Sequence, residues 1–112
     1  MSIRPSIPVV EQPALTLEHW RVFLAAGNCH VVAWCVENED GRVTSPVDKF
    51  DAARRLAITK SGRIYKLSGP PGDNGDADYT WQRWKHLLRI QEVRDVTNDV
   101  LRTIQRDVSG MH

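Results

Sequence analysis

Residues 66–88, KLSGPPGDNGDADYTWQRWKHLL, decide the fold class, because the character of the chain changes within them. The segments before this stretch are short and rich in β-branched and aromatic residues, as in strands. From Asp78 to about Val108 there is neither glycine nor proline, which is typical of helix. We expect the glycines and prolines to form the exit from a sheet and Asp76 or Asp78 to cap the helix that follows. The sequence therefore predicts an α+β fold.

The sheet is expected over about residues 18–67, as an antiparallel β-meander of about five short strands. Asp40-Gly41 predicts a type I′ hairpin turn, and Ser61-Gly62 predicts a second tight turn. Residues 17–26 also fit a helix begun by Thr16, although we favour a strand. The expected strands are 18–25, 29–37, 42–50, 55–59 and 63–67.

The helical part is expected over about residues 78–108 and carries two apolar faces that point in different directions. The first face is predicted to dock on the sheet and consists of Thr80, Trp81, Trp84, Leu87 and Leu88. One sheet cannot bury both faces. Either the chain bends near residues 89–92 and a second helix folds back, or one long helix offers its second face to another molecule. The absence of a Gly or Pro breaker slightly favours the long helix.

The second face has the three-four spacing of a helix-pairing seam. It predicts a protein or homodimer interface, with packing inside the chain as an equally strong alternative. The residues of this candidate interface are Ile90, Val93, Thr97, Val100, Leu101, Ile104 and Val108.

Length and composition fit one soluble domain, residues 15–112, preceded by an extended proline-containing arm, residues 1–14. No apolar run is long enough to cross a membrane, and the prolines of the arm interrupt any signal-peptide core, so a cytoplasmic location is expected. Cys29 and Cys35 would lie about 20 Å apart in one strand at ~3.3 Å per residue, which predicts buried free thiols instead of a disulfide.

The loop within residues 66–88 fits neither a phosphate loop nor a calcium loop. It has no lysine at the phosphate-loop position, its prolines lack amide donors, and its aspartates would repel phosphate. No frame starting at Asp73 or Asp76 gives the ligand spacing of an EF-hand. The histidines and cysteines lack metal-ligand spacing, and no nucleophile elbow is present. We therefore expect no metal, no cofactor and no catalytic residue.

Basic residues gather in a predicted hairpin, residues 54–66, and on one helix face, residues 83–89. Together they could follow a nucleic-acid backbone. The net charge of only +1 argues against this function, because the molecule as a whole has little field to attract phosphate. The candidate contacts are Arg54, Arg55, Lys60, Arg63, Lys66, Arg83, Lys85 and Arg89.

The pattern GRVTSP…FD…R…TKSGRIYKLSGPPG…DYTWQRW, within residues 41–84, resembles small uncharacterised proteins of bacterial prophages and other mobile elements. The resemblance implies a compact protein that binds or inhibits host machinery, and it implies no site residues. We therefore predict a non-enzymatic protein-binding module that regulates or inhibits a host system. A nucleic-acid-binding regulator is the alternative.

Overall fold

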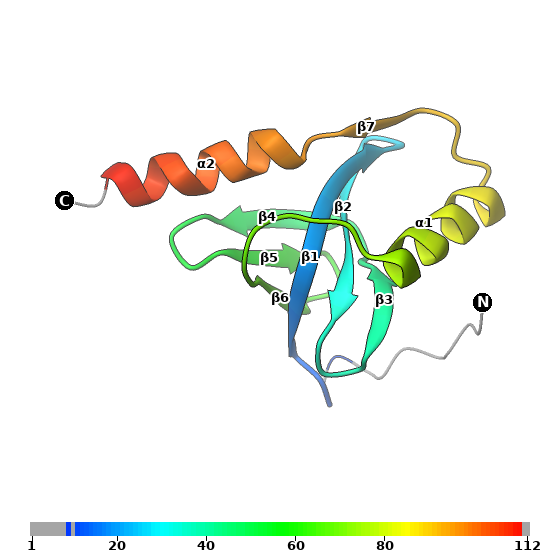
Figure 1. Ribbon diagram of the computed structural model, residues 1–112, viewed down its shortest axis with the longest axis horizontal. Helices are drawn as coiled ribbons and strands as arrows, with labels where there is room; N and C mark the ends of the chain where they lie inside the picture. Colours follow the sequence, from blue (N-terminus) through cyan, green and yellow to red (C-terminus); the bar gives the residue numbers. More distant parts are fainter. Residues whose placement is uncertain (1–8, 10, 111–112) are drawn as a thin grey trace.

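The computed structural model describes residue 9 and residues 11–110, which form one mixed sheet and two helices (Figure 1). The strands are β1 (Ala14–Ala25), β2 (Asn28–Cys35), β3 (Asp40–Val43), β4 (Val47–Asp51), β5 (Leu56–Thr59), β6 (Ile64–Leu67) and β7 (Val93–Asp95). The helices are α1 (Gly75–Leu87) and α2 (Thr97–Gly110). The α+β class is confirmed. Most of the predicted N-terminal arm, residues 1–8 and 10, lies outside the described residues.

The long strand β1 is the spine of the sheet, whose strand order is β3-β2-β1-β6-β5-β4. Strand β2 pairs with β1 along one side as an antiparallel hairpin. On the other side β1 pairs with β6 in parallel near its start and with β7 in antiparallel near its end. The strand prediction for residues 17–26 is therefore confirmed. The simple antiparallel meander of five strands is wrong, because the sheet has seven strands and one parallel pairing.

Two local predictions in the first half of the sheet are also wrong. The expected strand 42–50 is two strands, since Pro46 lacks the amide that would continue the ladder. The hairpin turn lies at residues 36–39, with the left-handed φ of 51° at Glu39, and not at Asp40-Gly41. Gly41 instead lies within β3, opposite Trp34.

A bulge in β1 changes which face its side chains point to. Leu17 and Trp20 are both fully buried, although strict alternation would place them on opposite faces. The register of the β1–β2 pair shifts between Glu18 and Arg21, and His19 has a φ of 50°. This extra residue restores Trp20 to the core side.

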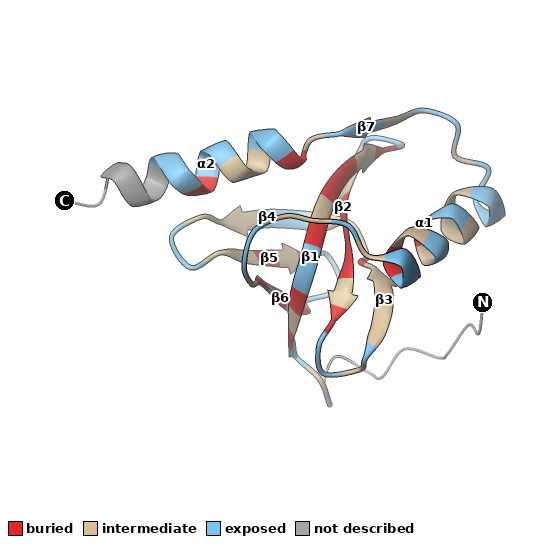
Figure 2. Ribbon diagram, viewed as in Figure 1, coloured by how far each residue is buried: buried red, intermediate tan, exposed pale blue. Residues whose placement is uncertain are grey.

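Buried residues are concentrated along β1 and β2 (Figure 2). They form two clusters, which the alternation along β2 places on opposite faces of the sheet. The larger cluster includes Val31 and Cys35 of β2 and is closed by Ile104 of α2. The smaller one includes Val32 and is closed by Trp81 of α1. Each helix therefore covers one face.

The C-terminal part contains two helices, so the fold-back alternative is correct and the single long helix is wrong. Helix α1 begins earlier than predicted, at Gly75. Its N-cap is Asn74, whose side chain accepts a hydrogen bond from the Ala77 amide at 2.9 Å, so the predicted cap at Asp76 or Asp78 is wrong. Among the described residues, no helix has the length and apolar character needed to span a bilayer.

Candidate functional site

Helix α1 is held on the sheet by a column of aromatic rings. Trp81 stacks on Phe23 of β1, with ring centroids 5.0 Å apart, and on Trp84, at 5.1 Å. Trp84 in turn contacts the ring of His30 at 4.6 Å. Such offset stacks add to the free energy of burying the rings. The predicted docking role of the two tryptophans is therefore confirmed.

Polar and backbone contacts fix the first half of α1. Arg21 of β1 forms ion pairs with Asp78 and, at 3.1 Å, with Asp73. The backbone of Asp76 and Ala77 lies so close to Gly41 of β3 that a Cβ built there would come within 2.4 Å of both. Only glycine permits this approach without a shift. The helix is thus a rigid support for its far end.

The far end of α1 projects past the sheet and is exposed to solvent (Figure 1). Leu87 and Leu88 are 55% and 56% exposed, so the prediction that they dock on the sheet with Trp81 and Trp84 is wrong. Beside them in sequence lie the cationic side chains of Lys85 and Arg89 and the imidazole of His86. We call residues Lys85, His86, Leu87, Leu88 and Arg89 the α1 end surface.

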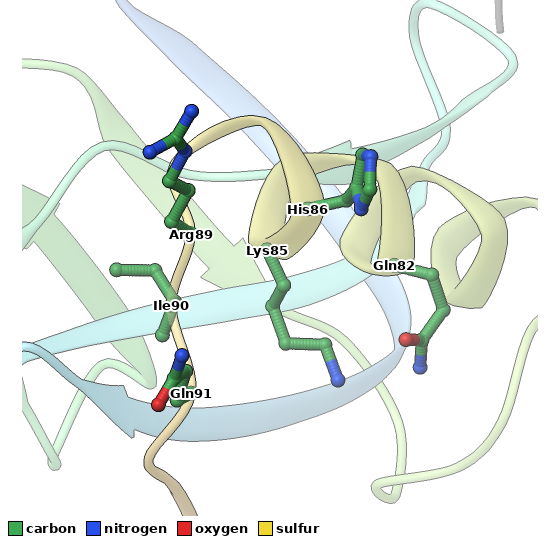
Figure 3. Close-up of a pocket in the computed structure, with 6 residues that line it drawn as sticks. All are labelled: Gln82, Lys85, His86, Arg89, Ile90 and Gln91. Carbon is green, nitrogen blue, oxygen red and sulfur yellow. The ribbon is translucent and has the colours of Figure 1, made fainter.

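An open depression of about 650 Å³ adjoins the α1 end surface, between the last turns of α1 and the residues that follow (Figure 3). Its polar lining consists of basic groups and amides, and no carboxylate lines it. The lining residues are Gln82, Lys85, His86, Arg89, Ile90 and Gln91. Its chemistry suits negatively charged groups.

Two arginines of the predicted basic hairpin, residues 54–66, are engaged in hydrogen bonds within the chain. Arg63 is only 5% exposed and donates to the Gln12 carbonyl at 3.0 Å. Arg55 donates to the carbonyls of Leu67 and Gly69, at 3.1 and 2.6 Å. Both guanidinium groups therefore hold the fold together.

The remaining basic residues of the hairpin differ in their surroundings. Lys60 is exposed and donates to Asn28 Oδ1 at 3.1 Å, Arg54 contacts Asp51, and Lys66 is exposed. Helix α1 packs on β2 and β3, whereas the β5–β6 hairpin lies toward the other end of the sheet (Figure 1). The hairpin and the basic face of α1 therefore do not form one continuous basic surface.

On the helix face itself, Arg83 is half-buried and its Nε has no hydrogen-bond partner among the described residues. Lys85 is held over the Trp81 ring, with Nζ 5.5 Å from its centroid. Arg89 is exposed. The last two lie in the α1 end surface, and their contact with nucleic acid stays a prediction.

The predicted interface residues divide between the two cores. Thr97 is 6% and Ile104 is 4% exposed, and Thr97 Oγ1 accepts a hydrogen bond from the Val22 amide at 2.9 Å. Val100 and Leu101 are half-buried against the larger cluster, and Ile90 and Val93 against the smaller one. The side chain of Val108 lies outside the described residues. Packing within the chain thus accounts for Thr97 and Ile104, and the homodimer stays a prediction.

The cysteines and His30, the residue types that could act as nucleophiles or metal ligands, have structural surroundings. Cys29 and Cys35 are free, and burial raises the pKa of both thiols. His30 is buried, with Nδ1 2.8 Å from the Thr44 carbonyl oxygen. Within the described part of the chain, no three His, Cys, Asp or Glu side chains are grouped to hold a metal ion.

Sequence reasoning missed the exposure of Leu87 and Leu88 and the depression beside them. The available signal was their position: both follow the last tryptophan, at the end of the helix, where the sheet no longer covers it. Comparison with family models, curated proteins and solved structures found no match.

Proposed function

We propose that the protein is a non-enzymatic module that binds another protein through the α1 end surface. The observation that carries the proposal is the exposure of Leu87 and Leu88, at 55% and 56%, beside Lys85 and Arg89. A partner that covers the leucines removes apolar surface from water, and the basic side chains next to them in sequence suit the polar rim of an interface. In keeping with the resemblance to prophage proteins, we place the partner in the cytoplasm of a bacterial host and expect binding to regulate or inhibit it.

The rigidity of α1 supports this function. The stacked rings of Phe23, Trp81 and Trp84 and the ion pairs of Arg21 hold the helix before any partner arrives. A surface that is already ordered loses little conformational entropy when it binds. The α1 end surface is therefore preorganised for docking.

A nucleic-acid partner has less support. Arg55 and Arg63 donate to backbone carbonyls within the chain, and the remaining basic groups do not form a continuous track. Affinity for a phosphate backbone depends on several simultaneous contacts. Such a backbone also offers no apolar side chains that would cover the exposed leucine pair.

The test is site-specific photo-cross-linking in cells that naturally produce the protein. A photoreactive amino acid is placed at Leu88 and, as a matched control, at Val36, which is 39% exposed on the β2–β3 turn. We expect a discrete protein adduct from position 88 that is absent from position 36 and is lost when Leu87→Ser is added.

Other outcomes would contradict the proposal. Equal adducts from positions 88 and 36, or adducts that persist with Leu87→Ser, would show that the α1 end surface is not the binding site. An adduct of twice the chain mass, with a dimeric mass in light scattering, would make the partner a second copy. Binding of duplex DNA without a protein adduct would favour the nucleic-acid regulator.

A further inference from the structure

Helix α1 ends in a Schellman motif in which Arg89 occupies the position that glycine usually takes. The Ile90 amide donates to the Lys85 carbonyl at 2.9 Å, and the Arg89 amide donates to the His86 carbonyl at 3.2 Å. This pattern requires a left-handed backbone at Arg89, whose φ is 54°. Glycine adopts this conformation without steric strain, whereas a residue with a Cβ does not.

The strain at Arg89 is not explained by a contact of its side chain. Arg55 also has a left-handed backbone, with a φ of 58°, but its guanidinium donates to two carbonyls of the chain. Among the described residues the exposed guanidinium of Arg89 forms no hydrogen bond and no ion pair. Strained residues are often kept where their side chains are needed for binding.

The depression next to α1 carries a second positive charge that is already held in place, although the side chains of Lys85 and Arg89 point in different directions (Figure 3). Arg89 and Lys85 both line the depression next to α1, together with the amides of Gln82 and Gln91 (Figure 3). The Trp81 ring holds the Lys85 ammonium at 5.5 Å, which limits its freedom before binding. The acidic residue nearest in the preceding turns, Asp78, is paired with Arg21. Glu92, three residues beyond Arg89, lines a neighbouring depression together with Arg89 but forms no ion pair among the described residues. Both positive charges therefore remain available to an anionic partner.

We infer that the partner presents to the α1 end surface a protein segment that carries both acidic and apolar side chains. This inference rests on the proposed function and specifies its chemistry. Carboxylates of the partner enter the depression and pair with Lys85 and Arg89, while apolar side chains cover Leu87 and Leu88. The leucines favour a protein segment over a nucleic acid. One peptide can present both carboxylates and apolar side chains, whereas a phosphate backbone presents anionic groups without apolar side chains.

The test uses the purified full chain and three fluorescent peptides of about 16 residues that share one leucine pattern and carry Glu, Gln or Lys between the leucines. We expect the Glu peptide to bind at least about tenfold more tightly than the Gln peptide and to lose affinity between about 50 and 500 mM salt. Duplex DNA of similar charge should bind more weakly than the Glu peptide.

Arg89→Gly separates binding from stability. We expect this variant to lose about tenfold in affinity for the Glu peptide. Its denaturant midpoint should be equal to or higher than that of the unmodified chain, because glycine relieves the left-handed strain. Lys66→Gln, which removes one exposed positive charge on β6, is the matched control and should leave the affinity unchanged.

Each contrary result has a distinct meaning. Equal affinity for the Glu and Gln peptides, or no binding of either, overturns the inference that the partner is acidic. The cross-link at position 88 separately decides whether the protein-binding function stands. A lower midpoint in Arg89→Gly overturns the strain argument. Tighter binding of DNA that is lost in Arg89→Gly overturns the inference in favour of a phosphate backbone.

Discussion

Alanine at Gly41 should destabilise the protein by about 1–3 kcal/mol, near the upper end of that range, because its Cβ would overlap with backbone atoms of α1. The added carbon would lie 2.3 Å from the Asp76 carbonyl carbon and 2.4 Å from the Ala77 amide nitrogen, where ordinary contact begins at 3.4 Å. Backbone cannot rotate away as a flexible side chain can. The start of α1 would therefore have to retreat by about 1 Å, which would loosen Ala77 and Trp81 from the smaller core.

Urea unfolding followed by tryptophan fluorescence measures the effect. Gly75→Ala is the matched control, because it adds the same methyl group at the first residue of α1, where no atom lies within 4 Å of a built Cβ and φ is not positive. The control should be neutral or stabilising by up to about 1 kcal/mol, since alanine favours helix over glycine. If Gly41→Ala loses less than about 0.5 kcal/mol, the close contact between α1 and β3 does not constrain the fold.

Trp81→Ala should cost about 3–5 kcal/mol in a urea titration, because the ring is 2% exposed, whereas His86→Ala on the exposed side of α1 should stay within about 0.5 kcal/mol. Partial burial alone would raise the pKa of Glu37, but hydrogen bonds from the Thr16 amide and hydroxyl lower it below 4.5. Its contribution to stability is therefore present above that value and disappears as the pH falls through the lowered pKa. Acid titrations of the unfolding free energy should show the Glu37→Gln difference at neutral pH and lose it in acid; a constant difference would contradict the assignment. Burial also raises the pKa of Cys35, so a thiol reagent should modify it only after the protein is unfolded, and rapid labelling of the native chain would refute its burial.

The elements that the sequence predicts well are those whose signals are local. The strand expected at residues 29–37 covers most of β2, and Ser61-Gly62 marks a turn in which Gly62 has a φ of 92°. The spacing of Trp81 and Trp84 identifies the face of α1 that packs on the sheet. In each case the residues that carry the signal also make the contact.

The elements that escape prediction depend on distant partners or on residues in unusual roles. Asp40-Gly41 has the composition of a hairpin turn, but Gly41 is needed for the close approach of α1, more than 30 residues later. The end of α1 carries no glycine or proline because Arg89 takes the glycine position, so the sequence slightly favours a single long helix. The exposure of Leu87 and Leu88 follows from where the sheet stops beneath α1, and their position after the last tryptophan is the only local sign of it.

The parallel pairing of β1 with β6 also determines the order in which the protein can be completed during synthesis. Strand β1 can form its hairpin with β2 as soon as both have left the ribosome. Its other side stays open until Ile64 pairs opposite Ala14, about 50 residues later, and β7 closes its far end only after α1 is made. During that interval the nascent chain presents an unpaired edge of its longest strand, the kind of surface that chaperones cover.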